Sequence, residues 1–150
     1  MIKNLKDQKG VRILSENYVG HLAFIEGETP YILPITYYYD KENHRILSYS
    51  SQGHKIQAMR KHNLVALCVD EIDSVNQWRS VLIHGEFEEI KGSDAKFLLH
   101  RFAEGVKEVI ARKEKKHLDF ISEFSSKLQS QGIPIIYQIK ITDTTGKYRE

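Results

Sequence analysis

Cysteine and long apolar runs are scarce in this sequence, and each shortage excludes a class of protein. The 150-residue chain has one cysteine, Cys68, so no disulfide can form within it. No segment approaches the roughly 18 consecutive apolar residues that a membrane helix needs. The amino-terminal stretch is charged from Lys3 onward and has no apolar signal core. We therefore expect a cytoplasmic protein with no membrane partner.

An excess of charge of one sign is also missing. The chain has 22 Lys and Arg against 20 Asp and Glu, which leaves a formal net charge of +2. Its most basic run, KEVIARKEKKHLD (107–119), mixes glutamate with lysine and arginine at helical spacing. That mixture is typical of a solvated helix face and not of a polyphosphate-binding surface. We expect no nucleic-acid partner.

Several catalytic and cofactor motifs are absent. The seven histidines form no His-Glu-x-x-His motif or other compact pair, and there is no second cysteine, so we expect no metal site. There is no G-x-S-x-G nucleophile elbow and no G-x-G-x-x-G dinucleotide fingerprint. The TGK at Thr145–Lys147 is not a phosphate loop, because Ile141 stands where that motif begins with glycine.

The order of the elements predicts one domain spanning residues 1–150. A helix is expected over about Lys6–Ser15, followed over residues 18–50 by a three-stranded meander with turn signals between its apolar runs. A short helix after Gly53 leads to two strands, and a longer helix with an apolar stripe starts at Ser93. The remaining expected elements are a second apolar stripe (Leu118, Ile121, Phe124, Leu128) and a last strand in IPIIYQIKIT (133–142).

Strands grouped early, helices grouped later and a closing strand are typical of an α+β domain. Six strands with many antiparallel turn signals favour a barrel. We therefore expect a mainly β fold, a six-stranded antiparallel split barrel flanked by helices. A chain of this length buries enough surface to fold without disulfides or metals.

The stretch SYSSQGHKI (48–56) has the ingredients of a phosphate pocket. Ser50 and Ser51 place two hydroxyls in the turn after a strand, and Gly53 allows a ligand to approach the backbone. The following helix start offers free amides, to which His54 and Lys55 add side-chain donors. Taken alone, the stretch fits simple helix capping better than a ligand site.

The stretch WRSVLIHGEFEEI (78–90) alternates like a strand but opens on Trp78, Arg79 and Ser80, which are suited to gripping a ligand. Together with GHLAF (20–24), YILPITYYYD (31–40), SYSSQGHKI and the late TGK, in this order, it resembles the FMN-binding split-barrel superfamily of pyridoxamine 5'-phosphate oxidase. The resemblance runs from about Val11 to Lys147. It is strongest to the branch that contains the 5-nitroimidazole resistance reductases.

This resemblance implies a homodimer with FMN held at the subunit interface, and it assigns roles to twelve residues. The FMN phosphate and ribityl chain would meet Tyr49, Ser50, Ser51, His54 and Lys55. Four residues would lie along the flavin ring, with their strand backbone at its polar edge: Leu33, Ile35, Thr36 and Tyr37. Trp78, Arg79 and Ser80 would close the site. Because Tyr37, Tyr38 and Tyr39 must alternate between strand faces, at least one belongs to the core or the interface.

The resemblance also implies an activity. We expect an FMN-dependent oxidoreductase that passes electrons from NAD(P)H or another donor to a small organic acceptor, with no catalytic side chain required. Two departures qualify this: Tyr49 replaces a histidine tied to nitroimidazole reduction, and His54 stands where arginine is common, which predicts modest FMN affinity. The alternatives are a non-catalytic flavin-binding module and a haem-binding split barrel with a histidine ligand.

Overall fold

The computed structural model describes residues 1–114 and 134–150, which form three helices and eight strands. The helices are α1 (Asp7–Glu16), α2 (His54–Lys61) and α3 (Ser93–Glu114). The strands are β1 (Ile2–Asn4), β2 (Val19–Glu26), β3 (Thr29–Thr36), β4 (Tyr38–Asp40), β5 (Arg45–Ser50), β6 (Leu64–Ser74), β7 (Gln77–Glu89) and β8 (Ile135–Arg149).

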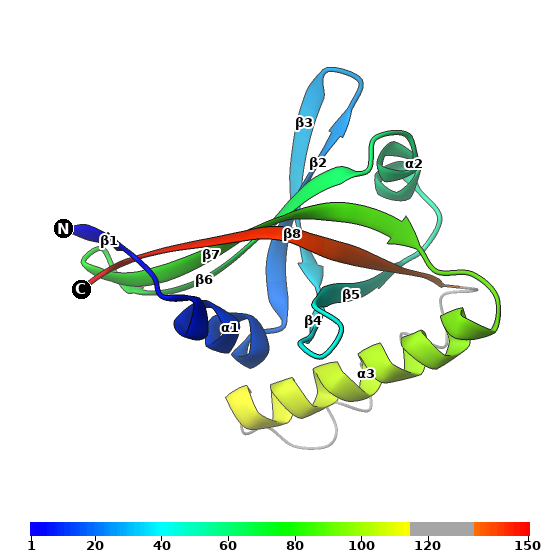
Figure 1. The fold of residues 1–150 in the computed structure, drawn as a ribbon. Coiled ribbons are helices and arrows are strands. Elements are labelled where there is room, and N and C mark those ends of the chain that lie inside the picture. Colours follow the sequence, from blue (N-terminus) through cyan, green and yellow to red (C-terminus); the bar gives the residue numbers. More distant parts are fainter. Residues whose placement is uncertain (115–133) are drawn as a thin grey trace.

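All strand pairs are antiparallel, in the order β3-β2-β6-β7-β8-β5-β4, with β1 added to β8 (Figure 1). The two ends of this order, β3 and β4, do not pair, so the sheet curls without closing. The predicted fold, a mainly β α+β domain with a split barrel and flanking helices, is confirmed. The described residues contain eight strands where six were expected, because β1 and β4 are additional short strands.

The predicted three-stranded meander is wrong. β2 and β3 form one hairpin, β4 and β5 form another, and these hairpins lie at opposite ends of the sheet order. The break falls at Tyr37, whose side chain is completely buried and whose hydroxyl donates to the Leu14 carbonyl at 2.8 Å. Its amide also donates to the Tyr18 carbonyl at 2.8 Å. The chain is therefore held between β3 and β4 by α1 and by the residues that follow α1.

For the remaining predicted elements, the structure mainly changes the residues at which they begin and end. The helices expected near Lys6 and from Ser93 are present as α1 and α3. The second apolar stripe at 118–128 lies outside the described residues. The last strand continues past residue 142 to Arg149, so the TGK segment belongs to β8, where Lys147 pairs with Ser80 on β7 and with Asn4 on β1.

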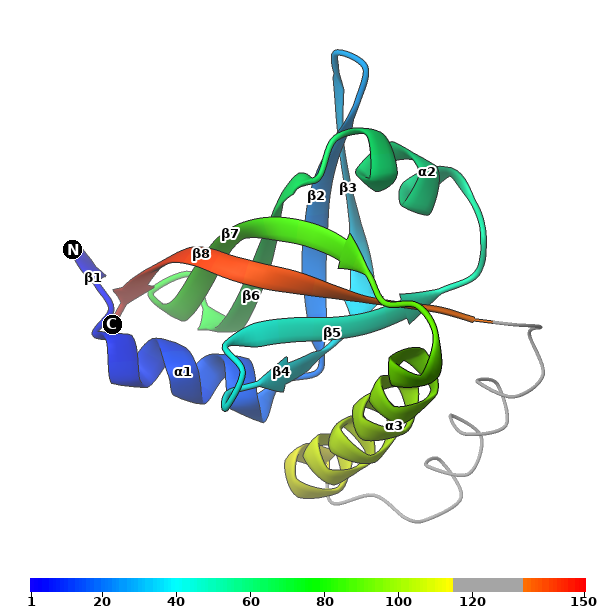
Figure 2. The same cartoon turned by 45° about the vertical axis from the view of Figure 1, so that its right-hand side comes forward.

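Two apolar clusters hold the elements together. The larger one fills the barrel and joins its strands to α1 through Ile13 and Leu14 and to α2 through Ile56 and Met59. The smaller one lies between α3 and the β5–β8 pair, which Figure 2 shows running beside each other. Apolar residues at helical spacing on α3, Leu98, Phe102, Val106 and Ile110, supply its helical side.

Candidate functional site

The open edge of the barrel lies where β3, the end of β5 and the start of α2 come together. The Ser48 hydroxyl on β5 donates to the Thr36 carbonyl at 2.7 Å, which ties the end of β3 to β5. On the other side, α2 packs against β2, and β2 is the one strand among the described residues with which β3 pairs (Figure 2). Because β3 is an edge strand, alternate backbone N–H and C=O groups along Leu33–Thr36 point away from β2.

The turn before α2 leaves the start of this helix without a side-chain cap. Gly53 is the N-cap residue, and no side chain accepts a hydrogen bond from the first turn. The Ser50 hydroxyl instead donates to the Ser51 carbonyl at 2.9 Å. A side chain at Gly53 would meet open space, and the Gly53 backbone is extended, with φ 172°. The capping interpretation therefore does not hold, and the amides remain available to an anion.

Lys55 is half-buried at the same helix start and has no ionic or hydrogen-bonding partner among the described residues. Burial lowers the pKa of its ammonium group, because the charged form loses hydration without gaining a counter-ion. An unpaired cation beside uncapped amides is the arrangement that a phosphate group would complete.

Replacing Lys55 with methionine is expected to stabilise the ligand-free protein by about 0.5–1 kcal/mol, because the aliphatic stem remains and the buried charge is removed. The cost of the lysine is present in full below its folded-state pKa and disappears as the pH rises from that pKa to the higher pKa of the unfolded state, since burial lowers the folded-state pKa. Urea unfolding at neutral and alkaline pH measures the effect. The stability difference should shrink at high pH; a less stable variant at neutral pH would contradict it.

His54 is turned toward the β2–β3 hairpin. Its Nε2 atom contacts the Glu26 carboxylate at the end of β2. The Tyr31 ring on β3 stands edge-on to the imidazole, with 5.0 Å between ring centroids, and Phe24 stacks behind Tyr31 at 5.5 Å. The described contacts of this imidazole thus come from the hairpin.

The predicted ring-lining residues divide between core and edge. Ile35 and Tyr37 are buried and Leu33 packs against the barrel cluster, so these three side chains face inward. Thr36 is half-buried on the alternate side of β3. A ligand at this edge would therefore meet the backbone of β3 more readily than the side chains of these residues.

The Tyr49 side chain belongs to the α3 side of the sheet. Its ring lies 5.4 Å from the Phe102 ring, and burial raises the pKa of its hydroxyl. Ser50, Ser51, His54 and Lys55 therefore form the turn itself, while Tyr49 anchors the strand that leads into it.

Trp78, Arg79 and Ser80 lie far from this turn within one chain. On β8, Ile135 pairs with Ser50, whereas Arg149 pairs with Trp78. These are the two ends of a 15-residue strand, which corresponds to roughly 45 Å of extended chain. The structure therefore brings the β3 edge and the α2 turn together in one protomer, but not the start of β7.

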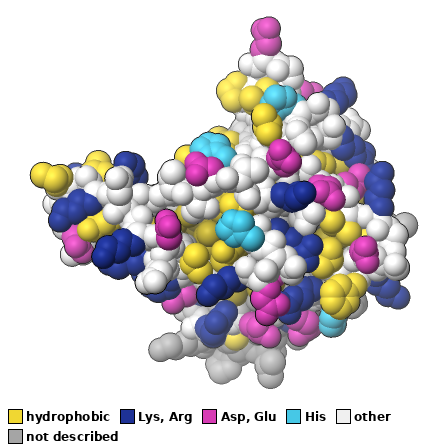
Figure 3. All heavy atoms as spheres, viewed as in Figure 1, with side chains coloured by type: hydrophobic (Ala, Val, Ile, Leu, Met, Phe, Trp, Pro, Cys, Tyr) yellow, Lys and Arg dark blue, Asp and Glu magenta, His cyan; other side chains and the backbone are white. Residues whose placement is uncertain are grey.

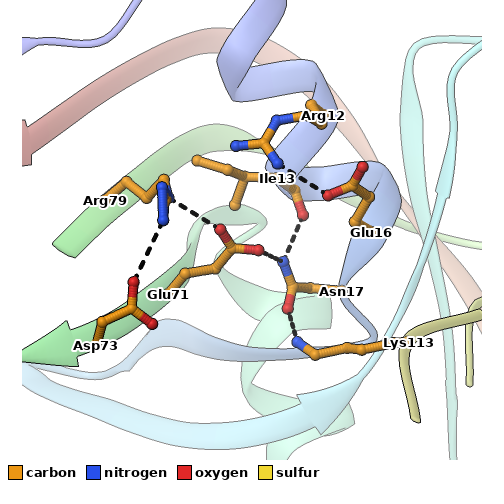
Figure 4. Close-up of polar contacts among 8 residues, drawn as sticks. All are labelled: Arg12, Ile13, Glu16, Asn17, Glu71, Asp73, Arg79 and Lys113. Carbon is orange, nitrogen blue, oxygen red and sulfur yellow. Dashed lines mark hydrogen bonds and ion pairs between the residues drawn. The ribbon is translucent and has the colours of Figure 1, made fainter. Parts of the chain in front are cut away.

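Arg79 also differs in orientation from its two neighbours. Its guanidinium donates to Glu71 at 3.1 Å and to Asp73 at 3.4 Å, on the side of β7 that α1 covers (Figure 4). Ser80 alternates to the other face, where its hydroxyl lies 3.3 Å from the Cys68 sulfur. Trp78 shares the face of Ser80.

A buried polar network beneath α1 has no counterpart in the sequence analysis. Asn17, only 4% exposed, donates to the Ile13 carbonyl at 2.8 Å and to Glu71 at 2.9 Å, while its side-chain oxygen contacts Lys113 (Figure 4). These contacts join α1, β6 and α3 across sequence separations of 54 and 96 residues. No local sequence signal marks such pairs.

None of the helices described in residues 1–114 and 134–150 packs on the face of β2, β6 and β7 that has an apolar groove. The groove is lined by Ala23, Ile25, Pro30, Leu64, Ala66 and His84, and Leu64 is 57% exposed. Figure 3 shows that hydrophobic side chains are exposed among the charged groups on the face in view. Such a patch is typical of a protein contact surface.

The described residues, 1–114 and 134–150, lack two features. No three His, Cys, Asp or Glu side chains gather where they could hold a metal ion. None of the helices in these ranges combines the length and the apolar character needed to cross a membrane.

Comparison with known proteins identifies the family. A model of the pyridoxamine 5'-phosphate oxidase family matches residues 6–147, which is nearly the whole chain. The chain belongs to this family. The resemblance drawn from the ordered motifs is thus confirmed at the family level.

The relatives of this family member are distant. An uncharacterized protein of Rhizobium meliloti is 33% identical over 78 residues, which are 52% of the chain and 50% of that protein. The chain thus spans about half the length of this curated relative. Among solved structures, a FAD-binding protein from Mesorhizobium loti has a TM-score of 0.77 at 22% identity, covering 100% of this chain and 98% of that one. A candidate 5-nitroimidazole antibiotic resistance protein from Bacteroides thetaiotaomicron has a TM-score of 0.65 at 16% identity, with coverages of 99% and 89%.

Proposed function

We propose that this family member binds FMN and acts as an FMN-dependent oxidoreductase, passing electrons from NAD(P)H or another donor to a small organic acceptor. The observation that carries the proposal is the half-buried, unpaired Lys55 beside the uncapped start of α2. A phosphate monoester supplies both the missing negative charge and acceptors for the amides. The FAD-binding protein of similar fold supports a flavin as the class of ligand.

The residues around the turn suit the rest of the cofactor. The hydroxyls of Ser50 and Ser51 lie between the end of β5 and α2 and would meet the phosphate and ribityl chain. The free backbone groups of β3 would orient the polar edge of the ring. A bound flavin supplies the hydride and electron chemistry itself, so the chain needs only to bind and orient it and to exclude water.

A second copy of the chain would complete the site as a homodimer. Trp78 and Ser80 lie too far from the α2 turn to close it from within the same protomer. They point to the same face of β7 as His84, which lines the apolar groove. A two-fold dimer through this face would place the β7 start of one protomer near the turn of its partner, twice by symmetry.

An absorbance spectrum of the purified protein tests the cofactor. We expect bands of oxidised flavin, and FMN, not FAD, in the supernatant after denaturation. A colourless preparation that binds neither FMN nor FAD when they are added would overturn the proposal. Sustained oxidation of NADH or NADPH with an added acceptor would then establish turnover, whereas its absence with FMN bound would favour a non-catalytic flavin-binding module.

A further inference from the structure

The contact between His54 and Glu26 joins the proposed phosphate turn to the β2–β3 hairpin. His54 is the first residue of α2 and Glu26 is the last residue of β2. The imidazole Nε2 atom contacts a Glu26 carboxylate oxygen, and the Tyr31 ring stands edge-on to the imidazole. The hairpin therefore fixes the side chain that stands closest in sequence to Lys55.

This contact has two chemical consequences for an anion at the helix start. A carboxylate can only accept hydrogen bonds, so Nε2 must carry a hydrogen and donate a hydrogen bond to Glu26. That donor is then not available to a phosphate. The Glu26 carboxylate also adds a negative charge beside the first turn of α2, and this charge repels a phosphate dianion.

We propose that Glu26 is an affinity-lowering determinant for the flavin phosphate, which makes the cofactor of this protein exchangeable. It acts by occupying the His54 donor and by placing a like charge next to the phosphate position. The inference rests on the proposed FMN site and extends it by naming the residue that sets the affinity for the phosphate. Lys55 and the α2 amides bind the phosphate, and the hairpin opposes them.

Titration of FMN and riboflavin into the protein measures the effect, because riboflavin lacks the phosphate. The Glu26→Gln variant keeps the shape of the side chain and removes its charge. We expect it to bind FMN about fivefold more tightly at low salt, and riboflavin with unchanged affinity. The gain should decline at high salt, because Glu26 is 44% exposed and is screened.

Two further variants separate this mechanism from a general change of charge. Glu28 is exposed in the turn of the same hairpin, so Glu28→Gln removes an equal charge and leaves the His54 contact in place. It should change FMN affinity less than twofold or so. The glutamine oxygen still accepts hydrogen bonds but holds the His54 donor less strongly than the carboxylate does. In a His54→Ala background, the gain from Glu26→Gln should therefore fall to about twofold, because that donor is absent.

The outcomes distinguish this inference from the function on which it rests. Equal FMN affinity of the wild-type and Glu26→Gln proteins would overturn the role of Glu26 and leave the FMN site intact. Equal tightening for riboflavin would also overturn it, because the effect would not involve the phosphate. If the wild-type protein binds neither FMN nor riboflavin, the proposed function fails, and this inference fails with it.

Discussion

Replacing Gly85 with alanine is expected to destabilise the fold by about 3 kcal/mol or more. Gly85 lies in the middle of β7, beside the register shift between His84 and Gly85. A Cβ atom here would lie 2.4 Å from the Lys140 carbonyl oxygen and 2.6 Å from a methyl carbon of Ile139. The backbone of β8 cannot move aside without breaking its ladder with β7, so the strain cannot be relieved locally.

Urea unfolding followed by circular dichroism measures this effect. Gly53→Ala is the matched control, because a Cβ atom at Gly53 meets open space and its extended backbone suits any residue. We expect the control to change stability by no more than about 0.5 kcal/mol. An unfolding midpoint for Gly85→Ala equal to that of the wild type would show that β7 and β8 separate more easily than their pairing implies.

The sequence predicts where most helices and strands lie, but not how the strands are ordered in the sheet. The alternation of apolar and polar residues marks β2, β3, β5, β6, β7 and the first part of β8, but not the short strands β1 and β4, and helical spacing marks α1 and the start of α3. Nothing in YILPITYYYD marks the break between β3 and β4, since the break falls at a tyrosine, Tyr37, and not at a glycine or proline. The break depends on the hydrogen bond from the Tyr37 hydroxyl to Leu14, which forms only when α1 packs under the barrel.

The parts of the candidate site that are close in sequence could be predicted. The contacts that depend on strand pairing or on packing between distant elements could not. The serine-rich turn and Lys55 lie within a few residues of one another, so the sequence shows the ingredients of an anion site there, although this stretch alone favoured helix capping and only the ordered set of motifs pointed to a ligand. The inward orientation of Arg79 follows from its register opposite Glu71, and the contact of His54 with Glu26 follows from the packing of α2 on β2. Neither the orientation of Arg79 nor the contact of His54 can be predicted from the residues next to them in the sequence.

Mixing two inactive variants is expected to restore FMN binding, because the proposed site takes residues from both protomers. Lys55→Ala would remove the phosphate cation and Trp78→Ala would remove a closing side chain of the partner's site. Each variant alone should bind FMN at least about tenfold more weakly than the wild type. After unfolding and refolding together in equal amounts, half of the dimers are mixed, and each mixed dimer has one intact site, so about a quarter of all sites should recover wild-type affinity.

The pattern of recovery distinguishes a shared site from two separate ones. A double variant with both changes in one chain, mixed with the wild type, provides the control, because its mixed dimers contain two singly defective sites and no intact one. Only the wild-type homodimers then keep intact sites, about a quarter of the total, whereas sites formed within single protomers would leave half of the total intact. Circular dichroism of each variant ensures that lost binding does not reflect lost folding; Ser80→Asp replaces Trp78→Ala if the latter unfolds. No recovery in the mixture, with both variants folded and dimeric, would contradict the shared site, because Lys55 and Trp78 lie too far apart within one protomer to form a site together. The start of β7 would then have no part in holding the flavin, and the site would consist of the β3 edge and the α2 turn alone.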